Sequence, residues 1–280
     1  MRYVESRPGA ALWPHLECVW IAADRERARR APERVVPDGC PELIVHLGDP
    51  YARRVGGRWR RQPRAFLAGT LTAPWLLQPG RRVLTLGVRF RPGEVRALFP
   101  VAMSAAAGRE TRLETIVGKA RADALVAALR AARGEAARFA AAETWLLEQL
   151  ARGPARPPSA RPAARLILRA RGAVRIAALA RTLGWTRRRL ERAFARELGV
   201  RPKLFARIVR LNAALSGLEA GERASTVDTA LDAGYFDQAH LLRDFRALAG
   251  RGPRSPRAAD GELARHFTDP ARLRLLLSGE

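Results

Sequence analysis

Apolar residues recur at helical spacing most regularly between residues 174 and 257. One short segment has them at positions i, i+3, i+4 and i+7, namely Ile176, Leu179, Ala180 and Leu183. Gly184 then ends the helix, because glycine takes the left-handed C-cap conformation without strain, and Thr186 suits the N-cap of a next helix. In that helix apolar residues recur at every fourth position, at Leu190, Phe194 and Leu198. The pattern predicts two short helices joined by a glycine turn.

The second helix of this pair has a basic face opposite its apolar one. With about 100° of rotation per residue, four arginines point away from the apolar residues: Arg188, Arg189, Arg192 and Arg196. This is the layout of a helix-turn-helix unit, whose second helix enters the major groove of DNA. Arginine can donate two hydrogen bonds to one guanine, and we expect this of Arg188 and Arg192, and of Arg243 further along the chain. For Arg187 and Arg189 we expect phosphate contacts.

The same pattern returns about 50 residues further along the chain. At a spacing of 50, four pairs match: Ile176 with Thr226, Ala180 with Ala230, Gly184 with Gly234, and Trp185 with Tyr235. One extra residue enters the turn, and at a spacing of 51 five more pairs match: Leu190 with Leu241, Arg192 with Arg243, Phe194 with Phe245, Gly199 with Gly250, and Pro202 with Pro253. Because unrelated helices would not share this register, we interpret the region as two helix-turn-helix units.

The second unit has its own capping signals. Ser225 and Asp228 have the spacing of a capping box, and Asp237 can cap the second helix of the unit. The outward face of that helix carries Ala239, His240 and Arg243. Between the units, residues 202 to 221 have a helical stripe at Leu204, Ile208, Leu211 and Leu215. A connecting helix of about 18 residues spans roughly 27 Å, so one chain could address two successive major grooves, about 34 Å apart.

The first half of the chain has shorter apolar runs bounded by proline and glycine, which predict strands. The runs are Leu16 to Ala22, Glu42 to Leu47, Ala65 to Leu71 and Val83 to Phe90. A short helix from Gly93 to Phe99 and longer helices between Leu113 and Leu150 should follow. Four prolines between Gly153 and Pro162 indicate an interdomain linker.

The predicted fold class is α+β. It comprises a small β-sheet or barrel with helices over residues 1–152, the linker 153–162, an all-α domain with two helix-turn-helix units over 163–258, and a tail, 259–280. The length of 280 residues agrees with two domains.

The net charge of the chain is weaker evidence for a nucleic-acid partner than its size suggests. The formal net charge of +24 would by itself favour a polyanionic partner. However, Lys119 and Lys203 are the only lysines among 51 basic residues, so 49 are arginine, as GC-rich genomes encode. No run approaches the roughly 18 apolar residues of a membrane span, and no secretory signal opens the chain, so we expect a cytoplasmic protein without membrane contact.

Four residues of the N-terminal domain could ligate zinc: His15, Cys18, Cys40 and His46. The cysteines stand beside apolar strand residues, so we expect free thiols that pack as small hydrophobes, with no metal and no cofactor. A regulator whose Cys40 accepts an alkyl group is an alternative. No activating base stands near Cys40 in the sequence, and we expect no enzyme.

Across the two helix-turn-helix units, over about 85 residues, the sequence resembles the AraC/XylS family of bacterial regulators. The matching segments of the first unit are residues 176–180, Gly184-Trp185-Thr186, residues 190–194, and Gly199 with Pro202. Those of the second unit are residues 230–235, residues 237–240, Arg243-Asp244-Phe245, and Gly250 with Pro253. The resemblance implies base contacts at Arg188, Arg192, Gln238, Ala239 and Arg243. Thr226, Thr229 and Pro256 depart from the residues usual in the family, which would weaken the second unit.

Residues 1 to 150 also resemble the N-terminal domain that precedes such DNA-binding domains in many high-GC bacteria. The matching stretches are residues 37–43, 65–69 and 86–93. By analogy with the family, this domain should sense a small molecule or mediate dimerisation.

We therefore expect a sequence-specific transcription regulator that binds double-stranded promoter DNA. A small-molecule effector or a partner should control this binding. The sequence leaves open whether the protein forms a homodimer. The expected DNA-binding residues are Thr186, Arg187, Arg188, Arg189, Arg192, Arg196, Asp237, Gln238, Ala239, His240 and Arg243. The alternative is an architectural protein that binds DNA without sequence preference.

Overall fold

The computed structural model describes residues 1–24, 31–153, 159–219 and 233–253. The first helix predicted for the second unit lies outside these residues, with Ser225, Thr226, Asp228, Thr229 and Ala230. Pro256 and the predicted tail also lie outside them.

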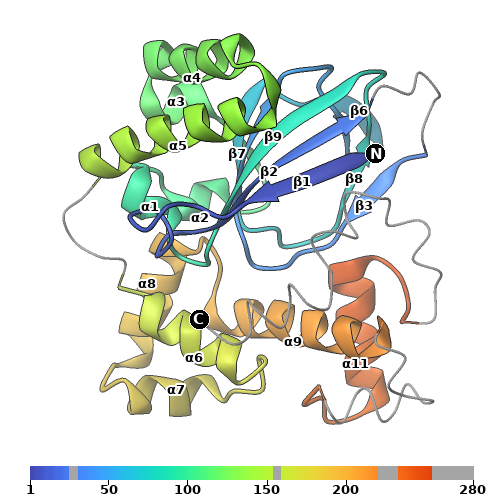
Figure 1. Ribbon diagram of the computed structural model, residues 1–280. Helices are drawn as coiled ribbons and strands as arrows, with labels where there is room; N and C mark the ends of the chain where they lie inside the picture. The colour runs from blue at the N-terminus through green and yellow to red at the C-terminus, as the bar shows by residue number, and fades with distance from the viewer. Residues whose placement is uncertain (25–30, 154–158, 220–232, 254–280) are drawn as a thin grey trace.

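The N-terminal domain is built on two antiparallel sheets (Figure 1). The larger sheet has the strand order β1-β2-β9-β4-β7-β10. Its strands are β1 (Arg2–Ser6), β2 (Leu16–Asp24), β4 (Glu42–His46), β7 (Ala65–Ala68), β9 (Val83–Phe90) and β10 (Glu110–Arg112). Both faces of β2 and β9 are buried, which explains why their sequences are continuously apolar rather than alternating. All four predicted strands are present in this sheet.

The smaller sheet has the order β3-β8-β5-β6 and contains strands that the apolar pattern does not predict. They are β3 (Glu33–Val35), β5 (Ala52–Val55), β6 (Arg58–Arg61) and β8 (Trp75–Gln78). The hairpin between β5 and β6 turns at Gly56 and Gly57, both with positive φ, as a two-residue hairpin loop requires. Strand β6 lies at the edge of the sheet with all four residues exposed, so no hydrophobic alternation marks it.

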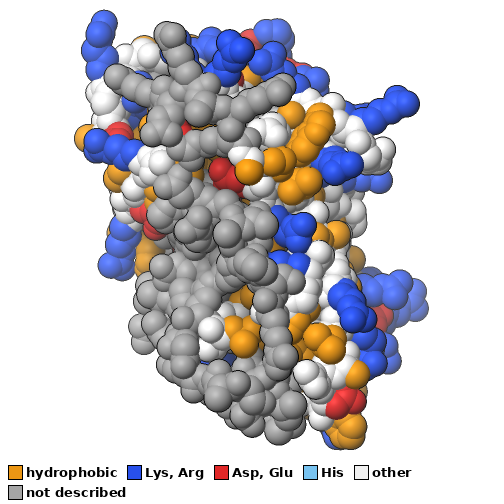
Figure 2. All heavy atoms as spheres, turned by 90° about the vertical axis from the view of Figure 1, so that its right-hand side faces the viewer, with side chains coloured by type: hydrophobic (Ala, Val, Ile, Leu, Met, Phe, Trp, Pro, Cys, Tyr) orange, Lys and Arg blue, Asp and Glu red, His pale blue; other side chains and the backbone are white. Residues whose placement is uncertain are grey.

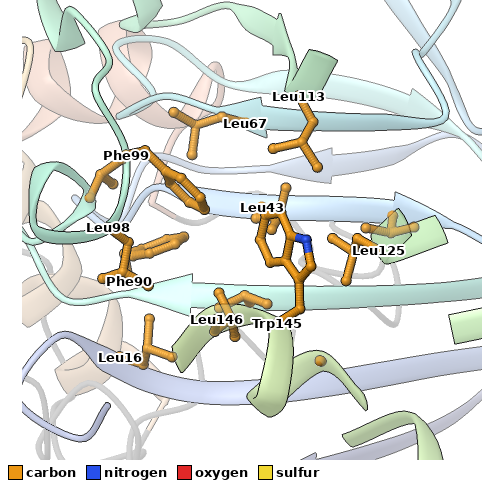
Figure 3. Packing of buried hydrophobic residues seen from close by; sticks show 14 of the residues in the cluster. Leu16, Leu43, Leu67, Phe90, Leu98, Phe99, Leu113, Leu125, Trp145 and Leu146 are labelled. Atoms are coloured by element: carbon orange, nitrogen blue, oxygen red, sulfur yellow. The ribbon is translucent and has the colours of Figure 1, made fainter. Parts of the chain in front are cut away.

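Five described helices come after β9, with β10 between the second and the third, and they pack against one face of the larger sheet. They are α1 (Val95–Leu98), α2 (Met103–Ala106), α3 (Leu113–Val117), α4 (Lys119–Ala131) and α5 (Gly134–Arg152). Figure 3 shows Trp145 and Leu146 of α5 packed toward Leu43 and Phe90 of the sheet. The first core therefore lies between this helical layer and the sheet.

The C-terminal domain is helical, as predicted, and lies below the N-terminal domain in Figure 1. Its elements are α6 (Arg161–Arg169), α7 (Ile176–Thr182), α8 (Arg187–Glu197), α9 (Pro202–Glu219), α11 (Gln238–Asp244) and a π-helical turn, η1 (Phe245–Ala249). Helix α6 already begins at Arg161, so the last two residues of the predicted linker are helical. Helix α9 is the predicted connecting helix, with α8 toward one of its ends and α11 toward the other.

Candidate nucleic-acid interface

The first helix-turn-helix unit is formed by α7 and α8 and has the local geometry that the sequence predicts. Gly184 ends α7 with φ +63°. The Thr186 side chain caps α8 by accepting the Arg189 N–H at 3.1 Å. Leu190 and Phe194 are fully buried in the core of the unit. Burial of this apolar face fixes the rotation of α8 and leaves its basic face outward.

Every arginine predicted on α8 is exposed. Near the start of α8, Arg187 pairs with Glu191 at 3.0 Å, and the Arg189 guanidinium lies 4.7 Å from the ring centre of Trp185. For Arg188 and Arg192, the described part of the chain supplies no hydrogen bond or ion pair. Their guanidinium groups are therefore available for a ligand.

Arg196, at the other end of α8, has an additional structural role. It donates to Ser159 Oγ and to Glu197 Oε1, both at 2.7 Å. Glu197 is buried and also accepts the Ala160 N–H at 2.6 Å. This network fixes the start of α6 against the end of α8, while the Arg196 side chain stays half exposed.

The described part of the second unit repeats the first. Gly234 has φ +77°, Tyr235 is buried, and Asp237 caps α11 by accepting the His240 N–H at 2.6 Å. Four of the predicted contact residues are exposed: Asp237, Gln238, Ala239 and Arg243. His240 is partly buried, with its ring edge-on to Tyr235 at 5.0 Å.

A buried ion pair that the sequence patterns do not reveal holds α11 against α9. Asp244 is 2% exposed and receives Arg207 Nε at 2.9 Å and Arg207 Nη2 at 2.8 Å. Burial and the Asp244 carboxylate together raise the pKa of Tyr235. The pair fixes α11 on the connecting helix α9.

The N-terminal domain holds both units at equivalent positions. Thr70 Oγ1 donates to the Leu198 carbonyl at 2.7 Å, just after α8. Arg34 Nη1 donates to the carbonyls of Ala249 at 3.4 Å and Gly250 at 3.0 Å, at the end of η1. Leu198 and Ala249 are related by the repeat spacing of 51 residues. We call Arg34 and Thr70 the bracing residues.

The loop between β3 and β4, residues 36–41, contacts the connecting helix α9. Asn212 Nδ2 on α9 donates to the Pro37 carbonyl at 2.9 Å. Cys40 packs into the core of the first unit, whereas Val36 packs into the core of the second. Gly39 has φ +92° and lies against the Phe205 ring, where a Cβ would be 2.8 Å from Phe205 Cε2. The loop therefore connects the N-terminal domain to both units.

A cavity of about 70 Å³ lies between the two sheets, close to this loop. Its lining includes Trp20, Phe66 and Trp75, together with the charged residues Asp38, Glu42 and Arg89. Arg89 is 1% exposed and binds three carboxylates: Asp38 at 2.6 Å, Glu17 at 2.8 Å and Glu42 at 2.8 Å. The cavity is apolar except for this charged cluster and a few hydrogen-bonded polar groups.

The four candidate zinc ligands have other contacts or are buried thiols. His15 pairs with Glu94 at 2.9 Å, His46 contacts Thr85 and Gln62, and both cysteines are buried free thiols. Within the described ranges no group of three or more His, Cys, Asp or Glu side chains has an arrangement that could hold a metal ion. Burial raises the pKa of Cys40 well above its usual range, so the reactive thiolate of the alkyl-accepting alternative is disfavoured.

Basic side chains are widely spread. Figure 2 shows lysine and arginine over the N-terminal as well as the C-terminal domain. The net charge therefore does not by itself locate the interface. None of the described helices has the length and hydropathy of a membrane span.

Comparisons with known proteins agree with this domain order. Residues 4–112 match a family described as a domain of unknown function (DUF6597), and residues 179–259 match one described as a helix-turn-helix domain. Comparison with curated sequences gives no match.

Solved structures similar to this chain include two of ToxT from Vibrio cholerae. One, at 1.65 Å resolution, is 8% identical with a TM-score of 0.46, over 84% of this chain and 95% of that one. The other, wild-type ToxT with bound unsaturated fatty acid, is 9% identical with a TM-score of 0.44, over 83% of this chain and 91% of that one. Likeness at this level supports no functional argument.

Proposed function

We propose that this chain, which has a helix-turn-helix domain behind a DUF6597 domain, is a sequence-specific transcription regulator of the AraC type. The observation that carries the proposal is the repeat itself: α8 and α11 expose equivalent arginines, Arg192 and Arg243, from equivalently capped helices. Helix α9 has 18 residues and is thus about 27 Å long, which suits recognition helices in successive grooves.

Selection of bound fragments from random duplex DNA tests this proposal on the full chain. We expect an enriched motif with two elements separated by about one helical turn, roughly 10 base pairs. The symmetry of the motif also reports whether one or two chains bind. An architectural protein would enrich no motif. Its affinity for DNA would fall with rising salt concentration by the same factor for every sequence.

We further propose that the N-terminal domain regulates DNA binding through the bracing residues. Each of them adjoins a residue that lines the cavity: Arg34 precedes Val35, and Thr70 follows Gly69. The loop of residues 36–41 likewise contributes Asp38 and Cys40 to the cavity lining while it contacts α9. An effector in the cavity could thus change the relative placement of the two units, which supports control by a small molecule.

Removal of both bracing contacts should weaken binding to the complete site. The double variant Arg34→Met, Thr70→Val removes the two hydrogen bonds of Arg34 and the one of Thr70, and we expect it to bind the complete site roughly 3- to 30-fold less tightly. Affinity for a half-site should stay unchanged, because each recognition helix is intact. Electrophoretic mobility shift assays with the complete site and with a half-site measure the ratio of the two affinities.

The matched control is Arg58→Met, Thr115→Val, which makes the same chemical changes at exposed positions. It should bind both sites as the parent protein does. An unchanged ratio of complete-site to half-site affinity in the bracing variant would contradict regulation through these contacts.

A further inference from the structure

The cavity between the sheets has an aromatic lining next to a cluster rich in carboxylates. Four aromatic side chains contribute to it: Trp20, Tyr51, Phe66 and Trp75. Ile44, Leu71 and Leu77 complete the apolar wall. Because the faces of aromatic rings carry partial negative charge, such a lining attracts a cation as well as apolar groups.

The charged groups in the lining carry an excess of negative charge. Asp38 and Glu42 are two carboxylates against the single guanidinium of Arg89. Glu17 occupies a third position around the same guanidinium, since it accepts from Nε while Glu42 accepts from Nη1 and Asp38 from Nη2. Arg89 is therefore compensated by carboxylates of the protein and is poorly placed to receive an anionic ligand.

The other basic groups near the cavity do not reverse this balance. Burial lowers the pKa of His46 to about 4, so its ring is neutral at physiological pH. Arg53 lies against Trp75 but pairs with Glu110 at 3.0 Å. Arg64 donates to the His46 carbonyl from an exposed position, where solvent screens its charge.

We propose that this cavity binds a small organic cation, an amine or a quaternary ammonium with an apolar body. The inference rests on the proposed regulatory function and names the chemical class of its effector. A volume of about 70 Å³ is several times the roughly 10–15 Å³ that one water molecule needs, so a compact ligand fits. Its charge would face Asp38 and Glu42, and its apolar part the aromatic wall.

Three probes of nearly equal shape separate charge from size. They are choline, its neutral isostere 3,3-dimethylbutan-1-ol, and the anion 3,3-dimethylbutanoate. Calorimetric titration of the full chain should give choline an affinity about tenfold higher than the alcohol, and no binding of the carboxylate. The inference is overturned if the alcohol or the carboxylate binds as tightly as choline, or if choline does not bind at millimolar concentration.

Two variants test the location of binding. Glu42→Gln retains a hydrogen-bond acceptor for Arg89 but removes one negative charge, so the preference for choline over the alcohol should fall at least threefold. Ala68→Leu, which fills the cavity from β7, should abolish binding of all three probes. The control variants Glu114→Gln and Ala124→Leu make the same changes at exposed positions, and they should bind the three probes as the parent protein does. Unchanged binding in both test variants would overturn the assignment.

The titrations contain no DNA, so the two proposals can fail separately. If the choline preference is absent while the selected DNA motif is bound, the ligand class is wrong and the proposed function stands. If choline is preferred but no DNA motif is enriched, the proposed function is wrong and the cation site stands.

Discussion

The double variant Arg192→Ala, Arg243→Ala is expected to lose most of its discrimination between the selected site and unrelated DNA. Each arginine is exposed on its recognition helix, and the repeat places them at equivalent positions. A bidentate contact to guanine contributes about 1 to 3 kcal/mol, so each substitution should reduce specific affinity roughly 5- to 150-fold. Each single variant should relax the preference at one base pair, in the corresponding half of the site.

Competition binding against a set of single base-pair substitutions measures this effect. Arg187→Ala is the matched comparison, because loss of a phosphate contact weakens all sequences alike and reduces the salt dependence. Arg130→Ala, at an exposed position on α4, should change neither quantity. If the Arg192 and Arg243 variants keep the parent preference at every base pair, then these helices do not read the bases in the way that we propose.

Arg89→Met is expected to lower the free energy of unfolding by about 3 to 5 kcal/mol, the largest stability change that we predict. The methionine fills similar space but leaves Glu17, Asp38 and Glu42 close together with no cation between them. When a buried carboxylate has no partner, no favourable interaction offsets the free energy lost on its desolvation. The variant should also bind DNA less well, because Asp38 belongs to the loop that contacts α9.

Urea denaturation followed by circular dichroism measures the first effect. Arg133→Met, at an exposed position before α5, is the control and should change stability by less than about 0.5 kcal/mol. A loss below about 1 kcal/mol for Arg89→Met would mean that the three carboxylates rearrange or become protonated without cost.

Local sequence predicted the described parts of the two helix-turn-helix units well. The positive φ of Gly184 and Gly234, and the caps at Thr186 and Asp237, all agree with the structure. These features depend on residues within four positions of one another, so the backbone preference of each residue is enough to predict them. The repeat then transferred the prediction from one unit to the next.

The N-terminal domain was predicted only in part. Strands β2, β4, β7 and β9 carry long apolar runs and were found, whereas the exposed residues of β6 and the three residues of β3 give no such signal. Arg89 lies within the predicted strand as the penultimate residue of β9, but the run of apolar residues gives no sign of its partners. Its carboxylate partners come from β2, β4 and the loop before β4, which only the pairing of the strands brings together.

The sequence by itself determined that this protein has two capped helices with outward arginines, α8 and α11, because that information is contained in short-range periodicity. The tertiary structure alone decided how the N-terminal domain contacts them. Thr70 and Leu198 are 128 residues apart, and Arg34 and Gly250 are 216 apart. Contacts over such separations follow from the packing of whole sheets and helices, and no local pattern of residues specifies them.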